Sequence, residues 1–84
     1  EPYNESIAMM RIARSRIAQG LYAEAENLLL ETEEKQKNLE SLHARAETLW
    51  TLGRVRTEKG DYQTAQTDLE NARQMVVEVG DRDD

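Results

Sequence analysis

Two arginines, Arg14 and Arg54, are the side chains in this sequence best suited to binding chemistry. Each follows a large hydrophobic residue by four positions, since Met10 precedes Arg14 and Trp50 precedes Arg54. A guanidinium binds a carboxylate through two parallel hydrogen bonds, and tryptophan is a frequent anchor of binding interfaces. The four residues therefore predict part of a surface for an acidic peptide or for the C-terminal carboxylate of a partner.

A catalytic or metal centre has little support in the sequence. His43 is the only histidine, and Glu40 and Glu47 are the acidic residues close enough on a helix to share a metal with it, which is a weak pattern. Asp81–Asp84 lacks the ligand spacing of a calcium loop. The absence of cysteine excludes disulfides and thiolate metal sites. We expect His43 to be a partly exposed helix residue, and the chain to be non-catalytic, without metal or cofactor.

Composition limits the class of partner. Of the 84 residues, 38% are hydrophobic and 33% are charged, with a net charge of −6. This acidity argues against nucleic acid as the main partner, because phosphate binding needs a positive field. The longest apolar runs, such as Ile7–Met10 and Leu28–Leu30, are too short to span a membrane. The lack of cysteine fits a cytoplasmic location, and the missing initiator Met indicates a piece of a longer protein.

Hydrophobic residues recur at intervals of three, four and seven, which is the spacing of amphipathic helices. No segment alternates like a strand, and the only proline, Pro2, lies at the start. The pattern predicts an all-α fold with antiparallel helices over 3–19, 21–37, 42–59 and 62–79, and a loop over 38–41.

Glycines and short polar residues mark the expected helix ends. Gly20, Gly60 and Gly80 each follow a helical pattern and suit the left-handed C-cap that glycine favours. Ser41 and Asp61 suit the N-caps of the third and fourth helices.

The sequence repeats at an offset of 40 residues. Gly20-Leu-Tyr22-Ala-Glu-Ala25 matches Gly60-Asp-Tyr62-Gln-Thr-Ala65, and Arg14, Arg16 and Leu29 align with Arg54, Arg56 and Leu69. A single domain of two helix–turn–helix units is therefore predicted, over about 3–40 and 41–80, with 81–84 as the start of a truncated third unit. Because repeat arrays usually need more units and terminal caps, we expect the chain to be a slice of a longer solenoid.

The second unit resembles the tetratricopeptide repeat, whose pattern has Trp, Leu-Gly and Tyr on the first helix, then Ala and an aromatic residue on the second. Its matching positions are Leu49, Leu52, Gly53, Arg56, Gly60, Asp61, Tyr62, Ala65, Leu69 and Ala72. The first unit matches less closely, at Met9, Ile12, Ala13, Arg16, Gly20, Tyr22, Ala25 and Leu29. The resemblance covers nearly the whole chain and implies a fragment of an α-solenoid.

Small residues at the matching positions have a packing role. They let two helices approach closely where a larger side chain would hold them apart, at Ala13, Ala25, Gly53 and Ala65. Tyr22 and Tyr62 begin the return helices, and we expect both to pack over the turns.

The repeat departs from the standard form. It spans 40 residues against roughly 34, and Val77 replaces the usual proline, so the second helix is expected to run on to about Val79. Arg16 and Arg56 stand where Tyr is common. This long form is similar to the repeat arrays of bacterial signal-transduction ATPases and of maltose-regulator-type transcription activators, and kinesin light chains also use long repeats.

In tetratricopeptide arrays the first helix of each unit lines a concave groove, where partner peptides usually lie. The resemblance puts Arg14 and Arg54 in this groove, one turn after Met10 and Trp50. Basic residues outnumber acidic ones on both first helices, and the reverse holds on both second helices. Two interpretations follow: a basic groove for an acidic peptide, or basic and acidic helices that pair with each other. Trp50 also has two interpretations: it anchors a partner, or it packs against a neighbouring unit.

The resemblance implies a protein-interaction scaffold in signal transduction that docks a peptide or a neighbouring domain. The alternative is the effector-sensing repeat region of a bacterial transcriptional or signalling ATPase, which would bind a small molecule within the superhelix. A flanking nucleotide-binding domain or DNA-binding helix–turn–helix would favour that alternative. Exposed solenoid ends also favour self-association of this chain, by end-to-end stacking or domain swapping.

Overall fold

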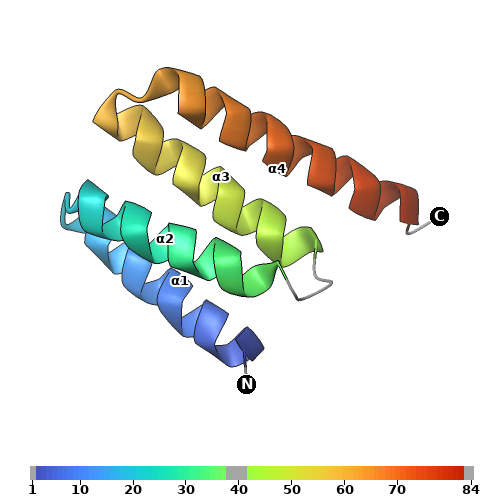
Figure 1. The fold of residues 1–84 in the computed structure, drawn as a ribbon, viewed down its shortest axis with the longest axis horizontal. Helices are drawn as coiled ribbons and strands as arrows, with labels where there is room; N and C mark the ends of the chain where they lie inside the picture. The colour runs from blue at the N-terminus through green and yellow to red at the C-terminus, as the bar shows by residue number, and fades with distance from the viewer. Residues whose placement is uncertain (1, 38–41, 83–84) are drawn as a thin grey trace.

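A computed structural model describes the backbone of residues 2–37 and 42–82, with side chains over 5–37 and 42–78. Within those ranges the chain forms four α-helices and no strand: α1 (Pro2–Ala18), α2 (Tyr22–Gln36), α3 (Leu42–Lys59) and α4 (Tyr62–Arg82). The helices pack as two antiparallel pairs, with both tight turns at the same end of the molecule (Figure 1). The predicted all-α arrangement of two stacked helical hairpins is confirmed.

The two turns have the same backbone geometry, 40 residues apart. Gly20 and Gly60 have φ angles of +78° and +89°, in the left-handed region that favours glycine. The residue after each glycine donates its N–H to a carbonyl five positions earlier, at 2.8 Å in both cases. This bond satisfies one of the carbonyls that a helix end leaves unpaired. The sequence repeat is therefore a structural repeat at its turns, as predicted.

The C-terminal end of α4 differs from the prediction. The helix continues through Gly80 to Arg82, so the assignment of Gly80 as a C-cap is wrong. A glycine permits the left-handed turn that Gly20 and Gly60 adopt, but it does not impose that turn. The expected start of a third unit, 81–84, falls partly on the last residues of α4. Residues 83–84 lie outside the described residues, so the third unit stays a prediction.

Other predictions near the helix ends have mixed outcomes. The loop over 38–41, with the proposed cap Ser41, lies outside the described residues. Asp61 directly precedes α4, and its carbonyl accepts the N–H of Ala65 at 2.9 Å.

No helix in the described part of the chain is both long enough and apolar enough to cross a membrane.

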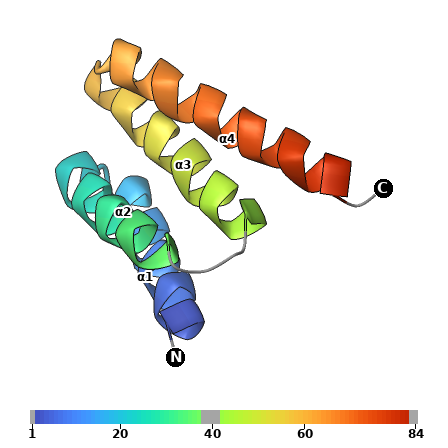
Figure 2. The same cartoon turned by 45° about the vertical axis from the view of Figure 1, so that its right-hand side comes forward.

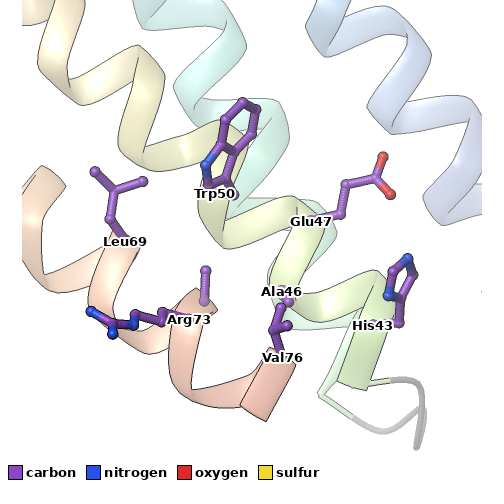
Figure 3. A pocket seen from close by; sticks show the side chains of 8 residues that line it. His43, Ala46, Glu47, Trp50, Leu69, Arg73 and Val76 are labelled. Atoms are coloured by element: carbon purple, nitrogen blue, oxygen red, sulfur yellow. The ribbon is translucent and has the colours of Figure 1, made fainter. Parts of the chain in front are cut away.

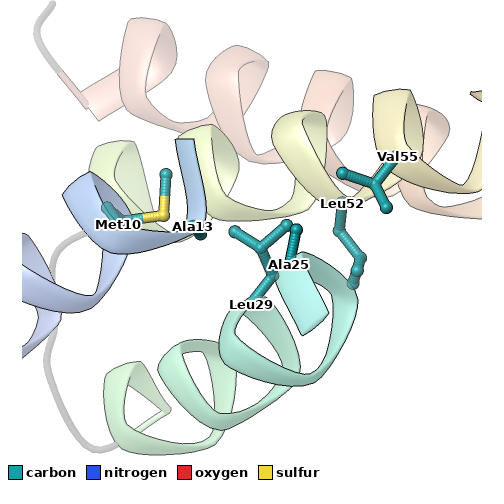
Figure 4. Close-up of a cluster of buried hydrophobic side chains, with 6 residues drawn as sticks. All are labelled: Met10, Ala13, Ala25, Leu29, Leu52 and Val55. Atoms are coloured by element: carbon teal, nitrogen blue, oxygen red, sulfur yellow. The ribbon is translucent and has the colours of Figure 1, made fainter. Parts of the chain in front are cut away.

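The core lies at the joint between the two helical pairs. Leu52 and Val55 from α3 pack against a cluster from α1 and α2 that consists of Met10, Ala13, Ala25 and Leu29 (Figure 4). A smaller cluster of Ala46, Leu49 and Ala72, with Met75 beside it, joins α3 to α4. Figure 2 shows the same order from a second side, with α3 between the first hairpin and α4. Helix α3 therefore belongs to both packing layers and positions every surface discussed below.

Gly53 marks the closest approach between α3 and α4. A Cβ atom on Gly53 would lie 2.8 Å from both Cγ and Cδ2 of Leu69 and 3.3 Å from the Ala65 carbonyl oxygen. Ala13 and Ala25 are fully buried and Ala65 nearly so. The close approach predicted at Gly53 is thus present, and the three alanines are buried where the sequence predicts small contact residues.

The two tyrosines do not behave alike. Tyr22 is half-buried and packs against the core cluster, and its predicted contact with the turn stays a prediction. Tyr62 is 69% exposed, so the expectation that it packs over its turn is wrong. The reason is the position of the two helices in the stack, because α3 packs on α2 whereas no described helix packs on the far side of α4.

Candidate functional site

A hollow of about 400 Å³ lies between α1 and α3. Its lining comes from both first helices: Arg14, Ile17 and Ala18 on α1, and Glu47, Trp50, Thr51 and Arg54 on α3. Arg14, Trp50 and Arg54 are three of the four residues that the sequence predicts for a peptide surface. The fold therefore brings together, from two helices, side chains that are separated by 40 positions in the chain.

Trp50 and Arg54 form a stacked pair on one side of this hollow. The guanidinium carbon of Arg54 lies 5.2 Å from the centre of the Trp50 ring, which is a cation–π distance. Trp50 is the only tryptophan in the sequence and is 51% exposed. Within the described residues, Arg54 has no carboxylate partner. The pair therefore presents an aromatic face and a guanidinium whose hydrogen-bonding edge is open to a ligand.

Arg14 faces the same hollow from α1 but already has a partner. Its guanidinium forms an ion pair with Glu47, and both side chains are about half exposed. Exposed ion pairs of this kind contribute about 0–1 kcal/mol, because water solvates both charges well. A ligand carboxylate can compete with Glu47 for Arg14 at little cost in stability.

Met10, the fourth predicted residue, does not belong to this surface. It is only 7% exposed and is part of the core cluster at the joint. Its sulfur accepts a hydrogen bond from the Thr48 hydroxyl of α3 at 3.6 Å. Met10 therefore does not line this hollow. It lines a separate hollow together with Arg14, and its contact with a partner stays a prediction.

A second group of charges lies on the other side of α3 and ties three helices together. Arg56 donates from Nε to Glu26 Oε2 of α2 at 2.9 Å and from Nη1 to Asp68 Oδ2 of α4 at 2.6 Å. Lys59 donates to the second oxygen of Glu26 at 2.7 Å. Hydrogen bonds from Lys59 and Arg56 lower the pKa of the Glu26 carboxyl, and the bond to Glu26 raises the pKa of the Lys59 ammonium.

The two interpretations of the helix charges therefore apply to different residues. Arg56 and Lys59 follow the pairing interpretation, because both neutralise acidic residues of neighbouring helices. Arg54, two positions before Arg56, points to the α1–α3 hollow instead. No role for the Arg56 cluster was predicted from the sequence. The signal was available, because the tetratricopeptide pattern that the repeat resembles usually has Tyr at this position, and a charge that replaces it in a packed region needs partners.

A further groove of about 540 Å³ lies between α3 and α4 and was not predicted. Figure 3 shows its lining, which is His43, Ala46, Glu47 and Trp50 from α3 and Leu69, Ala72, Arg73 and Val76 from α4. His43 is exposed at this groove, in agreement with the expected position. Over the residues that the structure describes, no group of three or more His, Cys, Asp or Glu side chains is arranged to hold a metal ion.

Comparisons of this chain with protein-family models, with curated proteins and with solved structures give no match. The tetratricopeptide assignment is thus carried by the residues of the repeat and by the stacked hairpins, and it stays a prediction.

Proposed function

We propose that this chain is a non-catalytic protein-interaction scaffold of the tetratricopeptide kind, which docks an acidic peptide in the hollow between α1 and α3. The observation that carries the proposal is the Trp50–Arg54 pair. An exposed tryptophan holds an arginine that has no carboxylate partner in the described part of the chain, and Arg14 lies on the same hollow. Tryptophan and arginine are the residue types most enriched among binding hot spots.

The proposed binding step uses each side chain differently. A carboxylate of the peptide accepts two hydrogen bonds from Arg54, whose ring partner Trp50 limits its conformational freedom before binding. A second carboxylate, or the peptide C-terminus, displaces Glu47 from Arg14. The apolar part of the peptide contacts Trp50, Ile17 and Ala18. The overall charge of −6 disfavours nucleic acid as a competing ligand.

Sensing of a small effector is the second candidate function, as part of a longer transcriptional or signalling protein. The observation in its favour is the volume of the hollow, which at about 400 Å³ lies in the range of small-molecule sites. The two functions differ in ligand length. A peptide scaffold binds an acidic peptide more tightly than free glutamate or citrate, and an effector sensor does the reverse.

A fluorescence titration tests the proposal, because the single tryptophan reports on the site itself. The ligand is a pool of seven-residue peptides with two fixed acidic positions and a free C-terminus. The matched pool has Gln or Asn at those positions and an amidated C-terminus. We expect the acidic pool alone to change Trp50 emission in a saturable manner.

Charge reversals identify the residues involved. The double variant Arg14→Glu/Arg54→Glu is expected to lose the response to the acidic pool. Arg11→Glu/Lys37→Glu is the control, since it changes net charge equally at exposed positions that line neither this hollow nor the α3–α4 groove. Equal responses of both double variants to the acidic pool would show that only overall charge matters and would overturn the proposal.

A further inference from the structure

The joint between the two helical pairs shows which surface a following helix covers. Helix α3 packs on α1 and α2 through Thr48, Leu52 and Val55, all nearly or fully buried. Beneath it lie Met10 and Gln36, which are 7% and 3% exposed. The packing of α3 on the α1–α2 hairpin therefore shows how the first helix of one unit packs on the hairpin before it.

The second hairpin presents the same seat, on which none of the described helices packs. Shifting Met10 and Gln36 by the repeat offset gives Trp50 and Val76, which line the α3–α4 groove. These two side chains are 51% and 55% exposed, whereas their counterparts are buried. Leu69, the counterpart of the fully buried Leu29, also lines the groove. The unpredicted groove is thus the position that α3 fills on the first hairpin.

The opposite end of the molecule presents the matching helix face. Shifting Thr48, Leu52 and Val55 back by the same offset gives Ala8, Ile12 and Ser15 on α1. These residues are exposed, and Ile12 is 43% exposed where Leu52 is fully buried. Helix α1 therefore has an uncovered face at the positions by which α3 docks.

We infer that two copies of this chain associate head to tail, with α1 of one copy seated in the α3–α4 groove of the next. Ile12 takes the place that Leu52 has in the internal joint, and Trp50 takes the place of Met10. The two surfaces differ from each other, so the contact does not close into a symmetric dimer and longer chains can form.

The strength of this contact is limited by two charge differences. Lys59 on α3 corresponds to the neutral Gln19 after α1. Glu26, which pairs with Arg56 and Lys59 in the internal joint, corresponds to Gln66 in the groove-bearing hairpin. The intermolecular joint therefore lacks the ion pairs of the internal one. The inference requires neither Arg14 nor Arg54, but it shares Trp50 with the proposed peptide site, since Trp50 lines both hollows.

Two single variants test the inference by complementation. Ile12→Asp removes the docking face and keeps the groove, and Val76→Asp removes the groove and keeps the docking face. In sedimentation velocity over a dilution series, we expect the unmodified chain to form species of increasing size with concentration, and each variant alone to stay monomeric. An equimolar mixture of the variants is expected to form a 1:1 dimer and nothing larger, because each copy supplies the surface that the other lacks.

Two control variants and a fluorescence measurement on the unmodified chain accompany the sedimentation experiment. Leu30→Asp and Val77→Asp add the same charge at exposed positions outside both surfaces, and we expect them to associate like the unmodified chain. Quenching of Trp50 by acrylamide in the unmodified chain is expected to fall as concentration rises, which needs no variant. An unmodified chain that is monomeric at every concentration leaves the groove to a different helix and overturns the inference. A symmetric dimer that both aspartate variants still form also overturns it.

Discussion

Arg56 and Glu26 bridge the joint between the two helical pairs, with the arginine Nε donating to the carboxylate Oε2 at 2.9 Å. Both side chains are mostly buried. Asp68 accepts a second hydrogen bond from Arg56, and Lys59 donates to the other oxygen of Glu26. A partly buried charge that loses its partner is costly, because the group left behind is neither solvated nor paired. This cluster fixes how the second hairpin sits on the first.

Replacing Glu26 by glutamine should weaken the joint. The Glu26→Gln variant keeps the shape of the side chain but removes the charge that two cations share, so we expect a loss of about 1–2 kcal/mol in the free energy of unfolding at pH 7. Urea denaturation followed by circular dichroism measures this. Glu24→Gln, an exposed position on the same helix, is the control and should change stability by less than about 0.5 kcal/mol.

The Glu26 effect should depend on pH in a defined direction. The pKa of Glu26 is lowered in the folded chain by Lys59 and Arg56, so its contribution is fully present above the ordinary glutamate pKa of 4.5. The contribution is lost as pH falls from there through the lowered folded pKa, because the unfolded chain binds the proton first. The stability difference between Glu26→Gln and the unmodified chain should therefore shrink below about pH 4.5. A difference that stays constant down to pH 2 would contradict this account.

Gly53→Ala tests the close approach of α3 and α4. The added methyl group would meet Leu69 at 2.8 Å. Overpacking costs about 1–3 kcal/mol, which exceeds the roughly 1 kcal/mol that alanine gains over glycine within a helix. We expect a net loss of about 1 kcal/mol by thermal or urea unfolding. In a Leu69→Ala background the same substitution should become neutral or stabilising, and a loss of equal size in both backgrounds would rule out the contact as its cause.

The two tyrosines at matching repeat positions should respond differently to truncation. Tyr22→Ala removes a half-buried ring from the core cluster and is expected to cost about 1–2 kcal/mol. Tyr62→Ala removes an exposed ring and should change stability by less than about 0.5 kcal/mol. Urea unfolding of the two variants side by side, at a concentration low enough for the chain to be monomeric, measures the contrast. Equal costs would mean that the second hairpin is covered in solution as the first one is.

The sequence repeat predicted the fold well because turn glycines and small contact residues are local signals. Gly20 and Gly60 need a positive φ, and Gly53 needs space, so their identities follow from their own surroundings. Gly80 carried the same local signal but lies within α4, since a glycine permits a turn without imposing one. Local patterns therefore identified the repeating unit more reliably than the C-terminal end of α4.

The candidate site was predicted only in part, because helix periodicity does not reveal what lies on each face. Met10 and Trp50 have equivalent positions in the two units, yet one is buried by α3 and the other is exposed. Arg54 and Arg56 are two positions apart and serve different purposes, a surface stack and a buried cluster. Such differences arise from which hairpin packs on which, and that is a property of the assembled fold.

The most direct test of the proposed function compares these two arginines by calorimetric titration with the acidic peptide pool. Arg54→Gln is expected to weaken binding at least about tenfold, which corresponds to the loss of a charge-assisted hydrogen-bonded pair, with unfolding unchanged. Arg56→Gln is expected to lower the free energy of unfolding while the folded chain keeps its affinity. Unchanged affinity in Arg54→Gln, or a greater loss in Arg56→Gln than in Arg54→Gln, would contradict the assignment of the hollow between α1 and α3 as the peptide site.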